Sequence, residues 1–191
     1  QVTFKKNSVL YGKVNGKEGW WHVVNSKVTY DTTVAENGNG WWYVKDGKVD
    51  FTYNGFSNNT NGWWYVDNGQ VTFKKNSVLY GKVNGKDGWW HVRGSQVTYD
   101  TTVAENANGW WRIENGKVNF NFIGLAANEN GWWYLKGGKV DFSYNGIAKN
   151  ENGQWYVKDG RIDFTYSGTV TFGQTSYVIK YGKVESQGTM K

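Results

Sequence analysis

The sequence contains no cysteine and no proline, and it has only two histidines. Without cysteine, the chain can form neither a disulfide nor a thiolate metal site. No stretch approaches the roughly 20 consecutive apolar residues that cross a membrane, so we expect no membrane insertion. His22 and His91 occupy one repeated position that elsewhere holds Tyr or Arg. Because no Ser-His-Asp set, metal-ligand cluster or phosphate-binding loop accompanies them, we expect no catalytic residue, metal site or cofactor.

Aromatic residues, by contrast, make up 18% of the 191 residues, and leucine and isoleucine are scarce. The burial of apolar surface must therefore come from Trp, Tyr, Phe and Val. All thirteen tryptophans sit at one position of a repeat, at intervals of 21 to 26 residues: Trp20-Trp21, Trp41-Trp42, Trp63-Trp64, Trp89-Trp90, Trp110-Trp111, Trp132-Trp133 and Trp155. A period of about 20 residues indicates a stacked repeat architecture.

The clearest repeat runs from residue 40 to 53 and recurs at 131–144 and 153–166. It contains two β-prone runs separated by Asp46-Gly47, which is the signature of a β-hairpin with a type I′ turn. The polar segment that follows each hairpin, such as residues 145–152, is interpreted as a link.

A longer period lies on top of this one. Residues 1–23 recur at 70–92 with one change, from Glu18 to Asp87. We predict an all-β fold, a tandem β-hairpin solenoid of about seven repeats of 21–22 residues with roughly three hairpins per turn. We interpret residues 1–191 as a single repeat domain cut from a longer protein, with residues 170–191 as a degenerate or capping repeat.

The hairpin register separates the two tryptophans of a pair, because side chains alternate between the faces of a strand. We expect the wholly apolar face to be buried, and it carries Trp42, Val44, Val49 and Phe51. The other face mixes rings with polar groups and carries Trp41, Tyr43, Asp50 and Thr52. The second Trp position never varies, whereas the first becomes Gln154 and the tyrosine position accepts Arg112. A core position would not readily accept Arg or Gln, so the second Trp is assigned to the core.

The first Trp of each pair has two interpretations. It packs between hairpins, because a chain so short of aliphatic residues needs every ring, or it lines a ligand groove together with Tyr. Three of these tyrosines face an acid across the strand, and such a wall suits a quaternary ammonium, through cation–π attraction, or a stacked sugar. The candidate ligand-binding residues are Trp20, Trp41, Tyr43, Asp50, Trp63, Tyr65, Trp89, Trp110, Trp132, Tyr134, Asp141, Tyr156 and Asp163.

Tandem units with a Gly-x-Trp-Tyr hairpin, an Asp-Gly or Asn-Gly turn and a glycine-led link resemble the cell-wall-binding repeats of Gram-positive surface proteins. The choline-binding and glucan-binding repeats are the best known, and residues 153–157 match most closely. The resemblance implies a β-hairpin solenoid that holds a secreted protein on the cell wall. The implied partner is a wall polymer (teichoic acid, possibly substituted with choline) or a polysaccharide.

The sequence departs from this family at its ligand cage. In choline-binding repeats one cage tryptophan follows the glycine of the link, and here that place holds Phe56, Leu125 or Ile147. The second tyrosine of the Trp-Tyr-Tyr run is also replaced, by Val44, Val66, Val157 or Leu135. The family's cage therefore does not carry over as it stands, and the first Trp of a pair would have to build a different one.

We weigh a non-catalytic cell-wall or glycan-binding module against a structural spacer or adhesin stalk with no ligand of its own. Several weak sites on one polymer would show avidity, whereas a stalk would not. The net charge of +6 comes mostly from lysines in turns, such as Lys48, Lys117 and Lys139, and is interpreted as a solubility feature. Nucleic acid is an unlikely partner, because these lysines sit away from the rings. The pairing of two chains into a homodimer through an end stays open.

Overall fold

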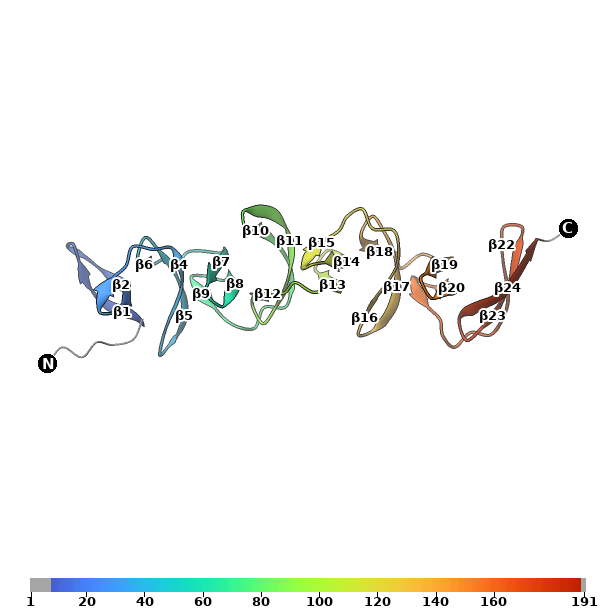
Figure 1. Ribbon diagram of the computed structural model, residues 1–191, viewed down its shortest axis with the longest axis horizontal. Coiled ribbons are helices and arrows are strands. Elements are labelled where there is room, and N and C mark those ends of the chain that lie inside the picture. The colour runs from blue at the N-terminus through green and yellow to red at the C-terminus, as the bar shows by residue number, and fades with distance from the viewer. Residues whose placement is uncertain (1–7, 190–191) are drawn as a thin grey trace. The chain divides into compact units, whose positions relative to one another are not determined.

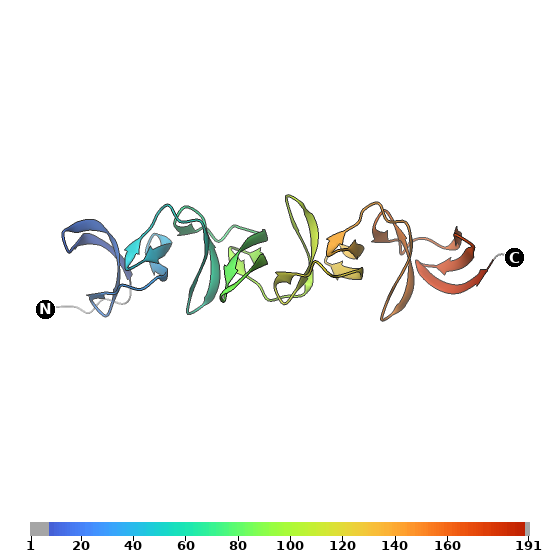
Figure 2. The same cartoon turned by 90° about the horizontal axis from the view of Figure 1, so that it is seen from above.

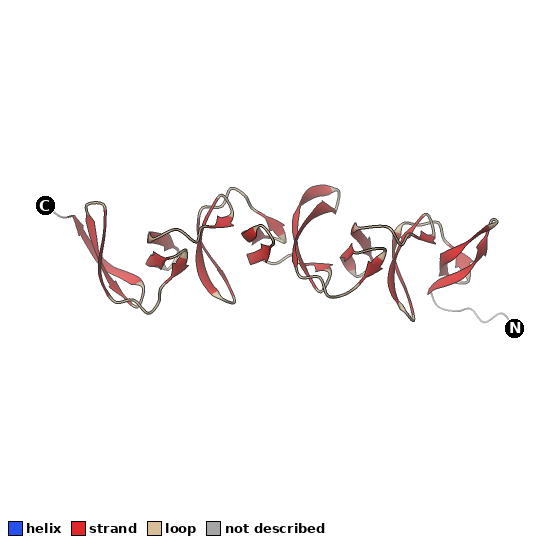
Figure 3. Ribbon diagram, turned by 180° about the vertical axis from the view of Figure 1, so that it is seen from behind, coloured by secondary structure: helices blue, strands red, loops and turns tan. Residues whose placement is uncertain are grey.

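The structure, a computed structural model, describes residues 8–189. Every regular element among them is a strand, as the all-red ribbons of Figure 3 show, and none of them belongs to a helix that could cross a membrane. This confirms the predicted all-β class. The chain divides into two compact units, Gln1–Thr98 and Tyr99–Lys191. Whether the whole chain is one domain, and whether it coils with three hairpins per turn, stay predictions.

The strands of the first unit, blue to green in Figure 1, are β1 Ser8–Val14, β2 Lys17–Val24, β3 Lys27–Val28, β4 Thr33–Asn37, β5 Gly40–Lys45, β6 Lys48–Val49, β7 Gly55–Asn59, β8 Gly62–Val66, β9 Gln70–Val71, β10 Ser77–Val83, β11 Lys86–Arg93 and β12 Gln96–Val97. Those of the second unit are β13 Thr102–Asn106, β14 Gly109–Glu114, β15 Lys117–Val118, β16 Gly124–Asn128, β17 Gly131–Lys136, β18 Lys139–Val140, β19 Gly146–Asn150, β20 Gly153–Lys158, β21 Arg161–Ile162, β22 Gly168–Phe172, β23 Thr175–Lys180 and β24 Lys183–Thr189.

The predicted turn is confirmed. Val44 pairs with Val49 and Lys45 with Lys48, and the turn residue Asp46 has the positive φ that a type I′ turn requires. The second strand of this hairpin is shorter than expected, because it ends at Val49. Beyond it, the Asp50 carboxylate accepts hydrogen bonds from the backbone N–H (2.9 Å) and the hydroxyl (2.6 Å) of Thr52, which turn the chain out of the ladder.

The segments interpreted as links are strands, which corrects the sequence-based interpretation. β19 lies within residues 145–152 and pairs over its full length with β20, so that Ala148 faces Trp155. The same pairing joins β4 to β5, β7 to β8, β13 to β14 and β16 to β17. These segments are rich in Asn and small residues, which are poor strand formers. They pair because the backbone hydrogen bonds between strands do not depend on the side chains. A small side chain also fits beneath the Trp ring that it faces. Figure 2 shows these hairpins as twisted ribbons.

Turn glycines connect one repeat to the next. The N–H of Gly47 donates to the carbonyl of Asp31 (2.9 Å), and its own carbonyl accepts from the N–H of His22 (2.8 Å). Gly69, Gly138, Gly160 and Gly182 accept from a Trp-bearing strand in the same way. Each turn thus lies between a Trp-bearing strand of the preceding repeat and the segment that follows that repeat's hairpin, and this places the rings of successive repeats side by side.

The second Trp of a pair lies in the core, as predicted, most fully at Trp21, Trp64, Trp90 and Trp133, which are at most 8% exposed. Val44 and Val49 are buried as well. The prediction for Phe51 is wrong, because it is 48% exposed. It lies beyond the end of β6, and its ring meets the edge of Trp42 (centroid distance 5.6 Å) at the surface.

The last segment continues the repeat. β22 pairs with β23, and Val170 faces Tyr177 as Ala148 faces Trp155. Tyr177 therefore stands where the other repeats have their second Trp. Whether this degenerate repeat acts as a cap stays a prediction.

Candidate functional site

The second Trp of each pair is held by its own indole N–H. In β5 the Nε1 of Trp42 donates to the Oδ1 of Asn37 (3.0 Å), which also accepts from the backbone N–H of Asn39 (2.9 Å). The same arrangement holds Trp64 on Asn59, Trp111 on Asn106, Trp133 on Asn128 and Trp155 on Asn150. The sequence carries a signal for it, since an Asn stands five residues before each of these tryptophans. The ring edge is thereby satisfied, and the ring faces remain for other contacts.

In several repeats, a Lys or Arg side chain from the next repeat lies over the ring of the second Trp. The cations and their distances to the ring are Lys48 over Trp21 (5.8 Å), Lys139 over Trp111 (5.4 Å), Arg161 over Trp133 (5.4 Å) and Lys183 over Trp155 (5.8 Å). Such contacts are attractive through the ring quadrupole. Lys48 and Lys139 therefore lie against rings, which corrects their interpretation as solvating turn residues. At the same place in the pairing, Trp42 and Trp64 face the neutral side chains of Gln70 and Gln96.

The first Trp of a pair meets rings of the next repeat. Trp41 contacts Trp64 (centroid distance 4.9 Å) and Phe73 (5.3 Å), and these two contact each other (5.6 Å), all edge to face. We call this set the Trp41 trio. The second unit repeats it as the Trp110 trio, with the distances 4.9, 5.8 and 5.7 Å among Trp110, Trp133 and Phe142. The sequence did not predict a role for this Phe, although it follows the second Trp by nine residues in both of these repeats.

A third set surrounds a cavity. Trp20, Trp42 and Phe51, which we call the Trp20 trio, line a cavity of about 220 Å³ together with Val9, Val49, Asn37 and Asn39. In the second unit Trp132 and Trp155 pack against one core cluster, and Phe164 meets Trp155 at 5.5 Å, which makes the Trp132 trio.

The remaining first tryptophans have other neighbours. Trp63 packs on the cluster of Phe56 and Trp90, and its Nε1 donates to the Oδ1 of Asn84 (2.8 Å). Trp89 lies beside Tyr80, with a centroid distance of 5.6 Å. All six first tryptophans are half-buried, which fits both packing and ligand contact.

The predicted tyrosines are packed rather than open. Tyr43 is only 7% exposed and stacks on Tyr53 at 3.7 Å. Tyr134 stacks in the same way on Tyr144, with a centroid distance of 3.7 Å. Tyr156 lies tilted against Tyr166, with a centroid distance of 4.7 Å. Tyr65 meets Phe56 at 5.5 Å. These contacts hold the base of each hairpin, and a ligand role for the four tyrosines stays a prediction.

The predicted acids are bound into their own turns. Asp50, Asp141 and Asp163 accept hydrogen bonds from the residue two positions on, which holds the pKa of each carboxyl below its ordinary value. The expected neighbourhood of Tyr43 and Asp50 exists. Burial raises the pKa of the Tyr43 phenol, and the negative charge of Asp50 raises it further. The Asp50 carboxylate is nevertheless engaged by the hydrogen bonds of its own turn.

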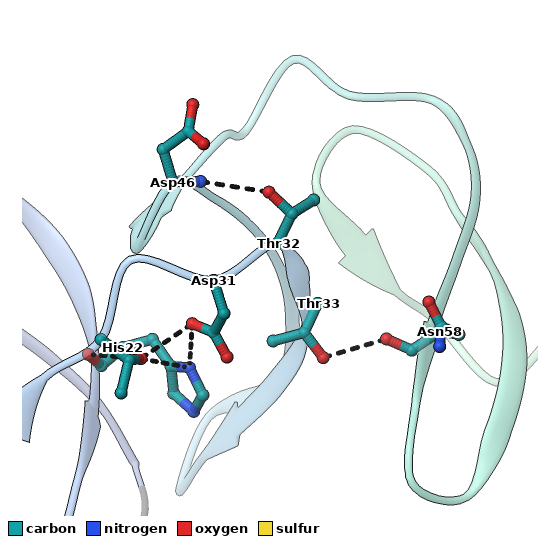
Figure 4. A network of polar contacts seen from close by, with 7 residues as sticks. His22, Asp31, Thr32, Thr33, Asp46 and Asn58 are labelled. Carbon is teal, nitrogen blue, oxygen red and sulfur yellow. Dashed lines mark hydrogen bonds and ion pairs between the residues drawn. The ribbon is translucent and has the colours of Figure 1, made fainter.

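A second, polar cavity of 280 Å³ lies in the first unit, and Trp41, His22, Asp31 and Glu36 help to line it. Figure 4 shows Asp31 pointing at His22, with the carboxylate 2.9 Å from Nδ1. Burial opposes ionisation of Asp31, but hydrogen bonds from His22 and Thr29 outweigh it and lower its pKa. Across residues 8–189, no group of three or more His, Asp or Glu side chains could hold a metal ion.

Five segments of the chain match the choline-binding repeat, namely residues 30–50, 52–72, 99–119, 121–141 and 143–163. No curated protein matches the sequence. One similar solved structure is the modular autolysin LytC from Streptococcus pneumoniae in complex with a synthetic peptidoglycan ligand, with 12% identity and a TM-score of 0.29. The match covers 90% of this chain and 46% of that one, so the chain spans less than half of its length. Because the matched repeats make up more than half of the sequence, the chain belongs to the choline-binding repeat family.

Proposed function

We propose that this chain is a non-catalytic module that anchors a secreted protein to the Gram-positive cell wall through its repeated aromatic sites. The observation that carries the proposal is the aromatic trio, in which two Trp rings and a Phe ring from successive repeats come together, with the first Trp half-buried and the Phe nearly half exposed. Exposed rings gathered in this way are unusual on a protein that binds nothing. Membership of the choline-binding repeat family supports the same conclusion.

The ligand that suits the trios is a quaternary ammonium group, such as the choline of a substituted teichoic acid. Aromatic cages bind such cations through the negative faces of their rings. Single sites of this kind are weak, but several on one polymer gain strongly through effective concentration. Of the predicted ligand-binding residues, we assign the ring walls to the first tryptophans. The tyrosines and aspartates support the hairpins that carry them.

The polar cavity favours a second ligand, a neutral polysaccharide. Trp41 offers a ring on which a sugar can stack, and the carboxylates of Asp31 and Glu36 can accept hydrogen bonds from its hydroxyls. Sugar binding and choline binding would then occupy different faces of the same unit.

The test is co-sedimentation of the protein with purified Gram-positive walls, before and after the teichoic acids are stripped. We expect retention that stripping abolishes and that free choline reverses. Retention that survives stripping and choline, but yields to soluble glycan, would move the assignment to the polar cavity. No retention on any wall would reject wall binding and leave the spacer function.

A further inference from the structure

The turn between β20 and β21 carries two cations in an open cavity of about 550 Å³. We propose that Lys158 and Arg161 bind a phosphate group there, as one phosphodiester of an anionic wall polymer. The inference goes beyond the proposed function, because this site takes an anion, lies at a turn rather than at a trio, and needs no choline. A teichoic acid would then meet the chain through its phosphates as well as through its substituents.

The two cations face each other across the hairpin. Lys158 pairs with Arg161 in the β20–β21 register, so their side chains leave the same face of the hairpin about 5 Å apart. Like charges placed directly opposite each other repel and lower stability. An anion bound between them would turn this repulsion into two attractions, so the pairing favours a site for an anion.

The fold does not demand a cation at both positions. Lys or Arg occupies both in four repeats, three of them consecutive, at 45 and 48, 136 and 139, 158 and 161, and 180 and 183. Elsewhere Asp67 stands opposite Gln70, and Glu114 stands opposite Lys117. Neutral and opposite charges are thus tolerated at this place. The paired cations in three successive repeats suit a ligand whose negative charges also repeat.

Arg161 is already oriented by its neighbours. Its guanidinium lies over the ring of Trp133, 5.4 Å from the centroid, and Nη2 donates to the carbonyl of Asn130 (2.5 Å). A guanidinium has several N–H donors in one rigid plane, and among residues 8–189 the others have no partner. Lys158 is exposed and has no hydrogen bond or ion pair in the same part of the chain. The site therefore offers a fixed guanidinium and an unpaired ammonium.

Two acids also line the cavity, but neither forms a salt bridge with Lys158 or Arg161. Asp163 accepts hydrogen bonds from the hydroxyl (2.6 Å) and the backbone N–H (2.9 Å) of Thr165. The Thr165 hydroxyl holds the pKa of Asp163 below its ordinary value, and the charge of Lys158 adds to this. Asp159 lies in the turn itself, and its charge should oppose a bound anion. The cations are thus not neutralised by their own hairpin.

The donors suit a phosphate better than a carboxylate. The Arg fork binds two oxygens of a phosphate at once, and Lys acts as a point charge. The oxygens of a phosphate point to the corners of a tetrahedron, so they can meet a guanidinium and an ammonium that approach from different sides. A carboxylate holds its acceptors in one plane. Phe164 lines the cavity as well and is 45% exposed, so it offers an apolar surface to the carbon chain of a polymer.

The test is an NMR titration of the whole chain with a choline-free poly(glycerol phosphate), following the Nε–H signal of Arg161 and the backbone N–H signal of Gly160. We expect both signals to move and saturate, and binding to weaken as sodium chloride is raised, because salt screens exposed charges. Arg161→Gln should weaken binding about tenfold. This variant should fold, because Gln96 holds the same position in another repeat and donates to the carbonyl of Asn61 (3.0 Å) as Arg161 does to that of Asn130.

Three further variants separate the site from general positive charge. Lys117→Gln removes a charge at the same position of a repeat in which Glu114 stands opposite, and it should change binding less than about twofold. Arg161→Lys keeps the charge but loses the fork, and it should weaken binding about threefold. Asp159→Asn should strengthen binding about twofold. Equal losses for Arg161→Gln and Lys117→Gln would overturn the site.

Other probes identify the anion. Inorganic phosphate should move the same two signals, but at a higher phosphate concentration than the polymer, because several phosphates on one chain raise the effective concentration. Equal binding of polyglucuronate would overturn the choice of phosphate, and equal binding of single-stranded DNA would overturn the choice of a wall polymer. If no probe moves the Arg161 signal, the site is rejected. Because no probe carries choline, that failure would leave retention on walls, and its reversal by choline, as a separate result.

Discussion

The two glycines of the β17–β18 turn give a sharp test of how the repeats are joined. Both have positive φ, 62° at Gly137 and 74° at Gly138. A Cβ on Gly137 would meet nothing nearer than 3.7 Å, whereas one on Gly138 would stand 2.2 Å from the carbonyl oxygen of Asn119 and 2.8 Å from the Cα of Phe120. Strain from the left-handed backbone is therefore shared by the two positions, and the clash belongs to Gly138 alone.

We expect Gly137→Ala to lower the free energy of unfolding by about 1–2 kcal/mol, the ordinary cost of an L-residue in this conformation. Gly138→Ala must also displace the turn, which holds two hydrogen bonds to its neighbours, from its N–H to Phe122 and from Arg112 to its carbonyl. At about 1 kcal/mol for each bond, the total loss is about 3–4 kcal/mol.

The assay is urea unfolding followed by tryptophan fluorescence and far-UV circular dichroism. Gly137→Asn is the control and should lie within about 0.5 kcal/mol of the natural chain, because Asn tolerates a positive φ and Asn115 occupies this place in another repeat. Equal losses for Gly137→Ala and Gly138→Ala would refute the reasoning, since the contacts of the turn with the preceding repeat would then contribute nothing measurable.

Three further predictions concern the hairpins. Asn128→Ala should cost about 2–4 kcal/mol in urea unfolding, because Asn128 accepts from Trp133 and Asn130 and donates to Val103; Asn128→Asp, which keeps the acceptor, should cost clearly less. Tyr144→Phe should cost about 1 kcal/mol, because it loses the bond to the Ile147 carbonyl and keeps the stack, and a neutral result would contradict this. The pKa of Asp141 is lowered chiefly by the Ser143 hydroxyl, so its stabilisation is present above the ordinary value of 3.8 and is lost as the pH falls below it. Ser143→Ala should therefore lower stability at pH 7 more than at pH 2.5, and equal losses at both would count against this role.

Much of the local structure could be predicted from the sequence. The Asp46-Gly47 turn fixes which residues pair, and the invariance of the second Trp identifies the core, because both features depend on residues close together in the chain. The exposure of Phe51 could not be predicted by the same argument. Extending the ladder past Val49 put Phe51 on the buried face, but the Asp50 side chain bends the chain first.

The strands in the links and the contacts of the lysines could not be predicted from the sequence, for a different reason. β19 has few residues that favour strands, and it forms because β20 offers it a partner. The position of Lys139 over Trp111 depends on a pairing between residues 28 apart, which no local pattern reports. Contacts between successive repeats are thus the part of the fold that a single repeat does not encode.

The same reasoning bears on the candidate site. A trio takes one ring from one repeat and two from the next, so no repeat contains a site by itself. The surroundings of a trio depend on residues outside it: Tyr11 lies beside Trp20, and Gln70 pairs with Trp42 where other repeats place Lys or Arg over the ring. Near-identical Trp pairs therefore have different surroundings in different repeats. Repeats that look alike in their tryptophans should be compared at these two flanking positions, because the side chains there differ in size and charge and lie against the rings.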